Sequence, residues 1–541
     1  MSIDYEKLRT KAKAIVVIPE HYRLEMEDNT PKGDEIERSF IWEDPGKDDC
    51  KIEVTLDLET GHLMRLEIDM ETKDAVDHDS SAEEARAIAD AFFMKHAPDH
   101  AAFTWVNIEE KRNFRFITYR EEVGGLPLSD TGCEITLDKG LNVIRYQLER
   151  SRQKAAPKPE WPSIIVDAET VRQHVLSDLR MDLTIVTLYP SMYEMEGTEP
   201  EYRLVYEPIP DHRLMDAITG VDLFGLEHYM MPPSHPIAPM EADKSNEPIQ
   251  VEGARGVDEM LTIGESLMCG KQLKLDDPRA GSIKDIATWE MLLGIDPRLF
   301  VLEKSKDDGE RIIMLYMLRE EVDEDLVPEA LSVDAYMKRK WGDSLRNLAA
   351  SFMIQIEKST GRLVGFHRNE REEEAAPLLS RKQCWEKAEQ FLRRVFPEYT
   401  SYLQIEVDRE DTDREPHDHE FFYLPVYIGN TPVNHERVTL SVSTSTGKIC
   451  VYMGVCYEMI RELVECNFYP TLTPEWAFDR YCEYVRFRLR WFKDSDEELS
   501  VYRLIYELTT TRRDDFPLGA GPYRGLRYID AYNGEPIWER I

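Results

Sequence analysis

The six residues YRLVYE at 202–207 return almost unchanged as YRLIYE at 502–507, about 300 positions later. Two tyrosines and a leucine alternate with polar and β-branched residues, which is typical of a half-buried β-strand. One matching strand arises easily by chance. A true duplication predicts that other signals repeat at a similar distance.

A second motif recurs along the chain: a strand, then an acidic or hydroxyl residue, then a turn that ends in Gly. Its glycines stand at 61, 140 and 220 and again at 361, 447 and 534, and the copy at 140 has its Gly displaced. Gly adopts positive φ without steric penalty, so each copy predicts a hairpin turn. The two series of three predict two triplets of one structural unit.

Helix starts follow the same repeat. Ser81 and Ser380 each precede an amphipathic stretch and have Glu84 or Gln383 three residues on, the pattern of a capping box. The expected apolar stripes are listed here: Ala85, Ile88, Ala89 and Phe92 in the first helix, and Cys384, Ala388, Phe391, Leu392 and Val395 in the second. A further pair of helices is expected to start at Asp167 and Thr473. These coincidences predict a tandem duplication.

The predicted fold class is α+β, in tandem units that each pack a helix on an antiparallel sheet. We expect a first half at 1–230 with units at about 1–70, 75–152 and 165–230, and a second half at 281–541 with units at about 283–370, 378–455 and 472–541. Between them, 231–280 begins with a Pro-rich stretch and is expected to be a linker followed by an unassigned segment.

Composition limits the function classes. The net charge of −38 disfavours binding to nucleic acid or anionic lipid. The apolar run AIVVI at 14–18 is too short for a signal peptide or a spanning helix, so we expect no membrane span. Eight cysteines without a CxxC pair indicate a reducing compartment, and together these features predict a cytoplasmic protein.

The hairpin endings MDAITG at 215–220 and IDAYNG at 529–534, each after a capped helix, resemble the PepSY unit of thermolysin-type protease propeptides. The doubled arrangement is similar to bacterial proteins that carry the YcdB/YcdC repeated domain. The resemblance implies an extracytoplasmic or cell-surface role in binding or in regulating a peptidase. This sequence departs from the pattern in having no signal segment and no HExxH protease motif.

The best candidate metal site is DREDTDREPHDHEFFY at 408–423. His417 and His419 would point to one face at the start of a strand. Asp411, Asp413 and Glu415 could complete an oxygen and imidazole site. A solvated acidic loop between two strands is the alternative interpretation.

Other candidates have structural explanations. His96 and His100 are four residues apart, but Pro98 should end the helix between them, so His96 is expected to be stabilised by the helix dipole. The Gly-rich PLGAGPYRG at 517–525 predicts a long hairpin loop, although a small anion site with Arg512, Arg513 and Arg524 stays open. The aromatic stretch at 476–492 predicts one helix that packs between two units or, alternatively, presents a partner-binding face.

The sequence therefore predicts a non-enzymatic binding or regulatory protein with no assigned catalytic, cofactor or metal residues. We expect it to bind a peptide or protein partner by strand addition at sheet edges. Two alternatives stay open: a metal-dependent hydrolase that uses His417 and His419, and a structural envelope or spore component.

Overall fold

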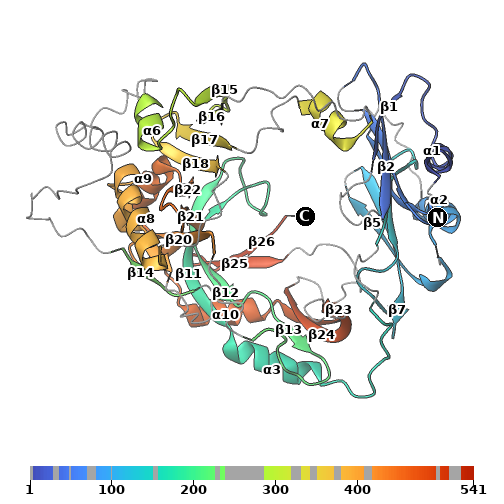
Figure 1. The fold of residues 1–541 in the computed structure, drawn as a ribbon. Coiled ribbons are helices and arrows are strands. Elements are labelled where there is room, and N and C mark those ends of the chain that lie inside the picture. The colour runs from blue at the N-terminus through green and yellow to red at the C-terminus, as the bar shows by residue number, and fades with distance from the viewer. Residues whose placement is uncertain are drawn as a thin grey trace, which may run out of the picture.

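The structure is a computed structural model that describes residues 4–28, 36–47, 50–69, 81–98, 100–111, 113–149, 156–225, 232–237, 286–318, 331–341, 350–370, 379–406, 417–494, 500–510 and 525–540. Two large sheets lie on opposite sides of the molecule, and helices cover the outer face of each (Figure 1). Their other faces, which we call the inner faces, are turned toward the centre. Within the described ranges, no helix is both long and apolar enough to cross a membrane.

The first sheet is a continuous antiparallel layer built from the N-terminal quarter of the chain, with helices α1 (Tyr5–Lys13) and α2 (Ala82–His96) on its outer face. Its strand order is β1 (Arg23–Asp28), β2 (Glu37–Glu43), β3 (Lys51–Asp57), β4 (Leu63–Asp69), β10 (Val143–Leu148), β9 (Cys133–Leu137), β6 (Phe114–Arg120) and β5 (Trp105–Lys111). A small hairpin, β7 (Glu122–Val123) and β8 (Leu126–Pro127), extends from it.

The predicted capping boxes at Ser81 and Ser380 are confirmed. Ser81 starts α2, and Ser380 starts the equivalent helix α8 (Arg381–Val395), with reciprocal side-chain bonds to Glu84 and Gln383 respectively. All five predicted stripe residues of α8 are buried. In α2 the stripe is rotated: Phe93 is buried, whereas Ile88 is 38% exposed. The reason is that Phe93 stacks on Tyr119 of β6, with 4.0 Å between ring centroids.

The second sheet begins with the same strand arrangement as the first and is then extended by strands from both halves of the chain. Its first strands are β15 (Phe300–Asp307), β16 (Arg311–Leu318), β17 (Ala350–Glu357), β18 (Leu363–Glu370), β22 (Ile449–Met453) and β21 (Thr431–Ser443), with β20 (His419–Ile428) paired to β21. Helices α6 (Ile286–Leu292), α8 and α9 (Tyr457–Glu465) cover its outer face. β21 then meets β11 (Arg180–Leu188) of the first half in a parallel contact between Ile185 and Val433.

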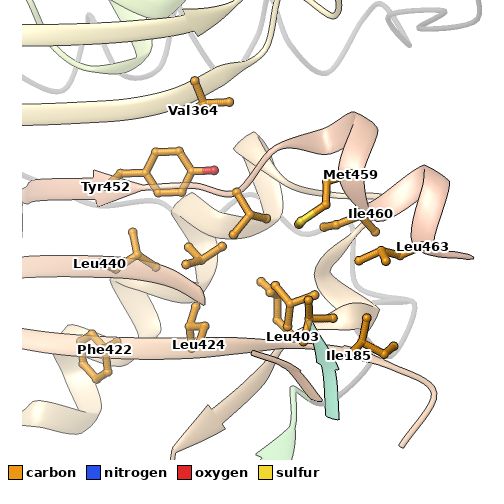
Figure 2. Packing of buried hydrophobic residues seen from close by; sticks show 14 of the residues in the cluster. Ile185, Val364, Leu403, Phe422, Leu424, Leu440, Tyr452, Met459, Ile460 and Leu463 are labelled. Atoms are coloured by element: carbon orange, nitrogen blue, oxygen red, sulfur yellow. The ribbon is translucent and has the colours of Figure 1, made fainter. Parts of the chain in front are cut away.

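Figure 2 shows how the two halves share this core. Side chains from neighbouring strands, among them Leu440 and Tyr452, lie with Ile460 and Leu463 of α9. Ile185 enters the same cluster from β11 and is 1% exposed. One hydrophobic core therefore contains residues from both halves, and the halves cannot separate without exposing it.

The last elements of the two halves exchange strands. In the first half these elements are α3 (Ala168–Asp178), β11, β12 (Glu201–Ile209) and β13 (Leu214–Asp216). In the second half they are α10 (Pro474–Cys482), β23 (Val485–Asp494), β24 (Val501–Thr510), β25 (Leu526–Asp530) and β26 (Pro536–Trp538). β12 pairs with β25, and β24 pairs with β13.

The exchange is reciprocal and keeps one register. In β12, which contains YRLVYE, Tyr206 is opposite Ile529, one residue before the DAYNG turn. In β24, which contains YRLIYE, Tyr506 is opposite Met215, one residue before the DAITG turn. Each copy of the repeated hexapeptide therefore pairs with the Gly hairpin of the other half.

The prediction of one helix over 476–492 is wrong. α10 ends at Cys482, and the chain continues as β23, antiparallel to β24 over its whole length. The side chains alternate as a strand requires: Trp491 is 4% exposed, while Arg490 on the other face forms two bonds with Glu507 at 2.7 and 2.8 Å. Because aromatic residues stand between the arginines, the alternation typical of a strand resembles a helical pattern in the sequence.

The predicted positive φ is present at Gly61, Gly220, Gly361, Gly447 and Gly534, between 65° and 77°. The side chain four residues earlier organises the turn: Asp57 Oδ1, for example, accepts from the backbone N and the hydroxyl of Thr60, both at 2.7 Å. In the displaced copy the left-handed residue is Leu141, with φ 61°, and not Gly140.

Candidate binding edges

Each large sheet has one edge that a segment from elsewhere in the chain covers. On the first sheet this edge is β1, where the backbone N of Glu27 donates to Leu331 O at 2.8 Å. Leu331 precedes helix α7 (Val333–Trp341), which lies between β16 and β17 in the sequence. The second half thus supplies a partner for the first sheet, and Figure 1 shows α7 beside β1 and β2.

Helix α7 packs on the inner face of this edge. Tyr336 forms a buried cluster with Met26 and Ile41, which face each other across β1 and β2. Asp28 caps the start of the helix by accepting from the backbone N of Val333 at 2.9 Å. A carboxylate at a helix N-terminus also interacts favourably with the helix dipole.

Charge complementarity fixes the rest of the α7 contact. Glu43 accepts from the hydroxyl of Tyr336 at 2.7 Å and from Lys340 Nζ at 2.8 Å. Arg339 Nε lies 3.3 Å from a carboxylate oxygen of Glu25. A basic helix therefore meets an acidic sheet edge.

On the second sheet the covered edge lies beside β20, which pairs with β21 outside the main strand order. The short strand β19 (Gln404–Glu406) continues this end of the sheet through a bridge between Leu403 and Val426. Its outer side pairs antiparallel with β14 (Ser234–Pro236), from the stretch predicted as a linker. Ser234 Oγ donates to Gln404 Oε1 at 2.8 Å. Part of the predicted linker is therefore an added strand.

The equivalent edge of the first sheet is β5. In both halves a capped helix of 15 residues is followed by a 3-10 turn, η1 (His100–Ala102) or η4 (Thr400–Tyr402), and then by the edge strand, β5 or β19. β5 pairs with β6 at all seven positions without a bulge. No described strand pairs with its other side. Alternate backbone N–H and C=O groups of β5 therefore point away from the sheet.

The side chains of β5 give this edge two different faces. Val106 and Ile108 pack against the hydrophobic core between the first sheet and its helices, and they continue its apolar layer. Trp105 and Lys111 lie on the inner face, where Lys111 Nζ is 2.9 Å from Glu109. A strand added here would extend the apolar layer with every second side chain.

Two described edge strands remain in the second sheet, β15 and the three-residue β26 at its other end. β15 is exposed but carries features that oppose pairing. Its register with β16 shifts between Leu302 and Lys304, which leaves Glu303 as a bulge. Lys304 and Lys306 are exposed on the strand. Bulges and lysines are common protections of edge strands, so β5 is the better candidate for strand addition.

A polar cluster joins the exchanged strands. Arg527 of β25 lies between two carboxylates, with one guanidinium nitrogen 3.0 Å from Glu207 Oε1 of β12 and another bonded to Asp211. Asn434 of β21 donates to Glu207 at 3.1 Å and to the hydroxyl of Tyr528 at 3.0 Å. The cluster links β12, β21 and β25, and so both halves.

The two carboxylates of this cluster titrate differently. Burial raises the pKa of Glu207, and the charge of Arg527 opposes this shift. Burial would also raise the pKa of Asp211, but bonds and charges from His212 and Arg527 outweigh it and lower the pKa to about 2. Separated carboxylate pKa values occur at catalytic sites. Here both groups bond to partners that connect strands, which indicates a structural joint.

The predicted metal cluster cannot be assembled from the described residues, because Asp411, Asp413 and Glu415 lie outside them. His419 is the first residue of β20, and His417 just precedes it, with its carbonyl accepting from the hydroxyl of Thr444 at 2.8 Å. Among the described residues, no group of three or more His, Cys, Asp or Glu side chains could hold a metal. Arg512, Arg513 and Arg524 of the proposed anion site also lie outside the described ranges.

His96 ends α2 as predicted, but the expected dipole stabilisation of its charge is wrong. Its ring packs on Phe92 with 4.4 Å between centroids. Burial lowers the pKa of His96 to about 4, so the imidazole is neutral near pH 7. His100 stands in η1, beyond the end of the helix, with its ring near that of Phe93.

Comparison with known proteins identifies relatives of the whole chain. The YcdB, YcdC repeated domain matches residues 5–150 and again 333–455. The chain is 26% identical to the uncharacterized protein YcdB of Bacillus subtilis (strain 168), over 99% of this chain and 98% of the relative. It is 23% identical to the uncharacterized protein YcdC of the same strain, over 93% and 96%. Among solved structures it is similar to the Bacillus megaterium YpeB C-terminal domain, with 13% identity and a TM-score of 0.26, over 41% of this chain and 95% of that chain.

Proposed function

Because this chain belongs to the YcdB/YcdC repeated-domain family and carries that domain twice, we propose that it is a non-enzymatic binding protein that captures an extended peptide by strand addition to β5. The captured segment would lie antiparallel or parallel to Trp105–Lys111 and bond to the outward backbone groups of this strand. Peptidases are the first partner class to test, because the turn motifs resemble those of protease propeptides.

The observation that carries this proposal is the pairing of β14 with β19. It is a strand addition inside the chain, at the edge equivalent to β5. Ile237, directly after β14, is 7% exposed and its N–H bonds to Leu403 O at 3.4 Å. This position in the fold therefore accepts an extended segment and buries an apolar side chain next to it. At β5 the place of β14 has no described occupant.

The chemistry of β5 suggests what its ligand contains. Every second ligand residue would lie beside Val106 and Ile108, where apolar side chains exclude water. The alternate residues would face Trp105 and the Glu109–Lys111 pair, which suits polar or aromatic side chains. We expect a ligand stretch of about five to seven residues with alternating character.

The test is selection of binders from a random peptide library, followed by measurements on two proline variants, Asn107→Pro and Ile108→Pro. Neighbouring strand residues point their N–H groups to opposite sides, so one variant removes a donor to the ligand and the other removes a donor to β6. We expect peptides to be enriched and the outward-facing variant to keep its circular dichroism spectrum while binding at least about tenfold more weakly. Selected peptides that bind both folded variants as tightly as the wild type would place the binding site elsewhere.

A further inference from the structure

The inner face of the second sheet carries a surface equivalent to the one that α7 covers on the first sheet. The equivalence follows from the bulges: Glu25 is bulged between Leu24 and Met26, and Glu303 is bulged between Leu302 and Lys304. When the two sheets are aligned on these bulges, Lys304 occupies the position of Met26. Leu315, which pairs with Lys304, occupies the position of Ile41. We propose that this second surface binds an amphipathic helix of a partner protein, with carboxylates beside its apolar stripe.

The surface is mostly apolar although it faces solvent, and polar side chains such as Gln355, His367 and Thr439 stand among its strands. Cross-strand register puts six side chains on the inner face, from β15 across to β20: Val301, Leu315, Met353, Met453, Tyr423 and Phe421. Met453 is 59% exposed, Phe421 45% and Val301 39%. The solvent face of an antiparallel sheet is normally polar, and a contiguous exposed apolar surface marks an interaction site.

The corresponding face of the first sheet is different in kind. There Arg145 bonds to Glu67, and Arg65 lies 3.7 Å from Glu53, so ion pairs cover the strands beyond α7. The apolar inner face is thus specific to the second half. A common feature of the repeated fold does not explain it.

The charges around the surface define the partner. On the first sheet the acidic Glu25, Asp28 and Glu43 receive a basic helix. On the second sheet Asp28 is replaced by Lys306 and Met26 by Lys304, both exposed and both on the inner face with Ile313 and Leu315. Glu303 keeps the place of Glu25 and Met317 takes the place of Glu43, so the cations of this edge are Lys304 and Lys306, and the helix that fits it carries carboxylates beside them.

A further cation, Arg437, lies at the far side of the apolar surface. Arg437 is exposed and its guanidinium stacks over Tyr423 at 4.8 Å from the ring centroid. Within the surface, the polar side chain of His367 is exposed on the same face, opposite Met353. Cations thus stand at both sides of an apolar strip, which matches a helix with one apolar stripe and acidic flanks.

The experiment compares two helix-stabilised peptides by fluorescence anisotropy at low salt. One has the sequence of residues 331–341, and the other replaces Lys338, Arg339 and Lys340 with Glu. We expect the acidic peptide to bind the full chain about tenfold more tightly than the basic one. The acidic peptide can form two or more exposed ion pairs with the cations of this surface, whereas the basic peptide is repelled by them. The first sheet does not compete, because its own α7 occupies the equivalent position.

Variants of the protein locate the binding. The Lys304→Glu, Lys306→Glu double variant should lose or invert the preference for the acidic peptide. The control Lys13→Glu, Lys382→Glu makes the same charge change at exposed positions on the outer helices and should leave binding unchanged. Phe421→Ser should weaken both peptides. Failure of both peptides to bind, equal binding of the two, or a preference that survives the Lys304→Glu, Lys306→Glu change would overturn the proposal.

Discussion

Tyr206 and Tyr506 make the same hydrogen bond in opposite directions between the halves. The hydroxyl of Tyr206, in the first half, donates to Leu472 O of the second half at 2.7 Å. The hydroxyl of Tyr506, in the second half, donates to Val166 O of the first half at 2.9 Å. Both carbonyls belong to the segment just before a capped helix, α10 or α3. The exchanged hairpins therefore follow an approximate internal two-fold symmetry.

We expect Tyr206→Phe and Tyr506→Phe each to lower the free energy of unfolding by about 1 kcal/mol, because each removes one buried hydrogen bond and leaves a carbonyl without its donor. Urea unfolding measures the change. Tyr532→Phe is the control, since Tyr532 is 71% exposed and should have no effect. Equal stability of all three variants would show that neither bond contributes.

Cutting the chain between the halves should not separate them. A protease site inserted in the segment 238–285 would leave both exchanged pairings, β12 with β25 and β24 with β13, intact. We expect the two fragments to elute together in size exclusion and to separate in concentrated urea. Separation of the fragments in buffer alone would contradict the exchange.

Arg527→Met should destabilise the junction strongly. It removes the guanidinium that the partly buried carboxylates of Glu207 and Asp211 share, while His212 stays beside Asp211, and we expect a cost of roughly 3 kcal/mol. The matched control is Arg298→Met. The Arg298 side chain is 79% exposed and forms an ion pair with Asp296. There we expect a change within about 0.5 kcal/mol. The loss of stability in the two variants can be compared by thermal unfolding.

The contribution of Asp211 to the free energy of unfolding should be measurable at low pH. Its pKa in the folded protein is about 2, below the value of about 3.9 for an unfolded chain. A depressed carboxyl pKa adds stability that is present above about pH 4 and is lost as the pH falls toward about 2. Since a third of the Asp211 side chain is exposed, we expect this part to be about 1 kcal/mol. Asp211→Asn should flatten the loss over this range, and an unchanged acid limb would argue against the low pKa.

The hairpins differ in their need for glycine. Gly220 has φ 72°, and a Cβ there would meet only Val166 at ordinary contact distance, so Gly220→Ala should cost about 1 kcal/mol for its backbone conformation alone. Gly140 does not have a positive φ, and Gly140→Ala should cost clearly less, since its added Cβ would meet mainly the exposed Asn142 side chain. Denaturant midpoints of the two variants give the comparison.

Local signals in the sequence predicted local structure well. Ser81, Ser380 and the glycines of the DxxTG turns act through neighbours within a few residues, so their geometry could be inferred without a fold. The prediction for the stretch after Cys482 was wrong because its aromatic residues follow directly on those of the preceding helix, and apolar side chains at this density fit a helical as well as a strand period. Burial of Trp491, whose indole N–H donates to Val123 O at 3.0 Å, depends on a hairpin that lies far away in the sequence.

The exchange of strands could not be predicted from the sequence for a different reason. YRLVYE and YRLIYE differ by one methylene group, and both Gly hairpins present an Asp–Ala pair in the same register. Either hairpin satisfies either strand, so local energies do not select the partner. The apolar inner face of the second sheet was likewise hidden, because residues such as Leu315, Met353 and Met453 become neighbours only through the strand order.

The exchange also imposes an order on biosynthesis. On the ribosome β12 emerges about 320 residues before β25, so one side of β12 stays uncovered while the rest of the chain is made. The first half can complete its N-terminal sheet early, but its last strands mature only when the closing hairpin of the second half has been translated. A stalled or prematurely terminated nascent chain would therefore display an aromatic-rich strand edge, which is the kind of surface that chaperones recognise.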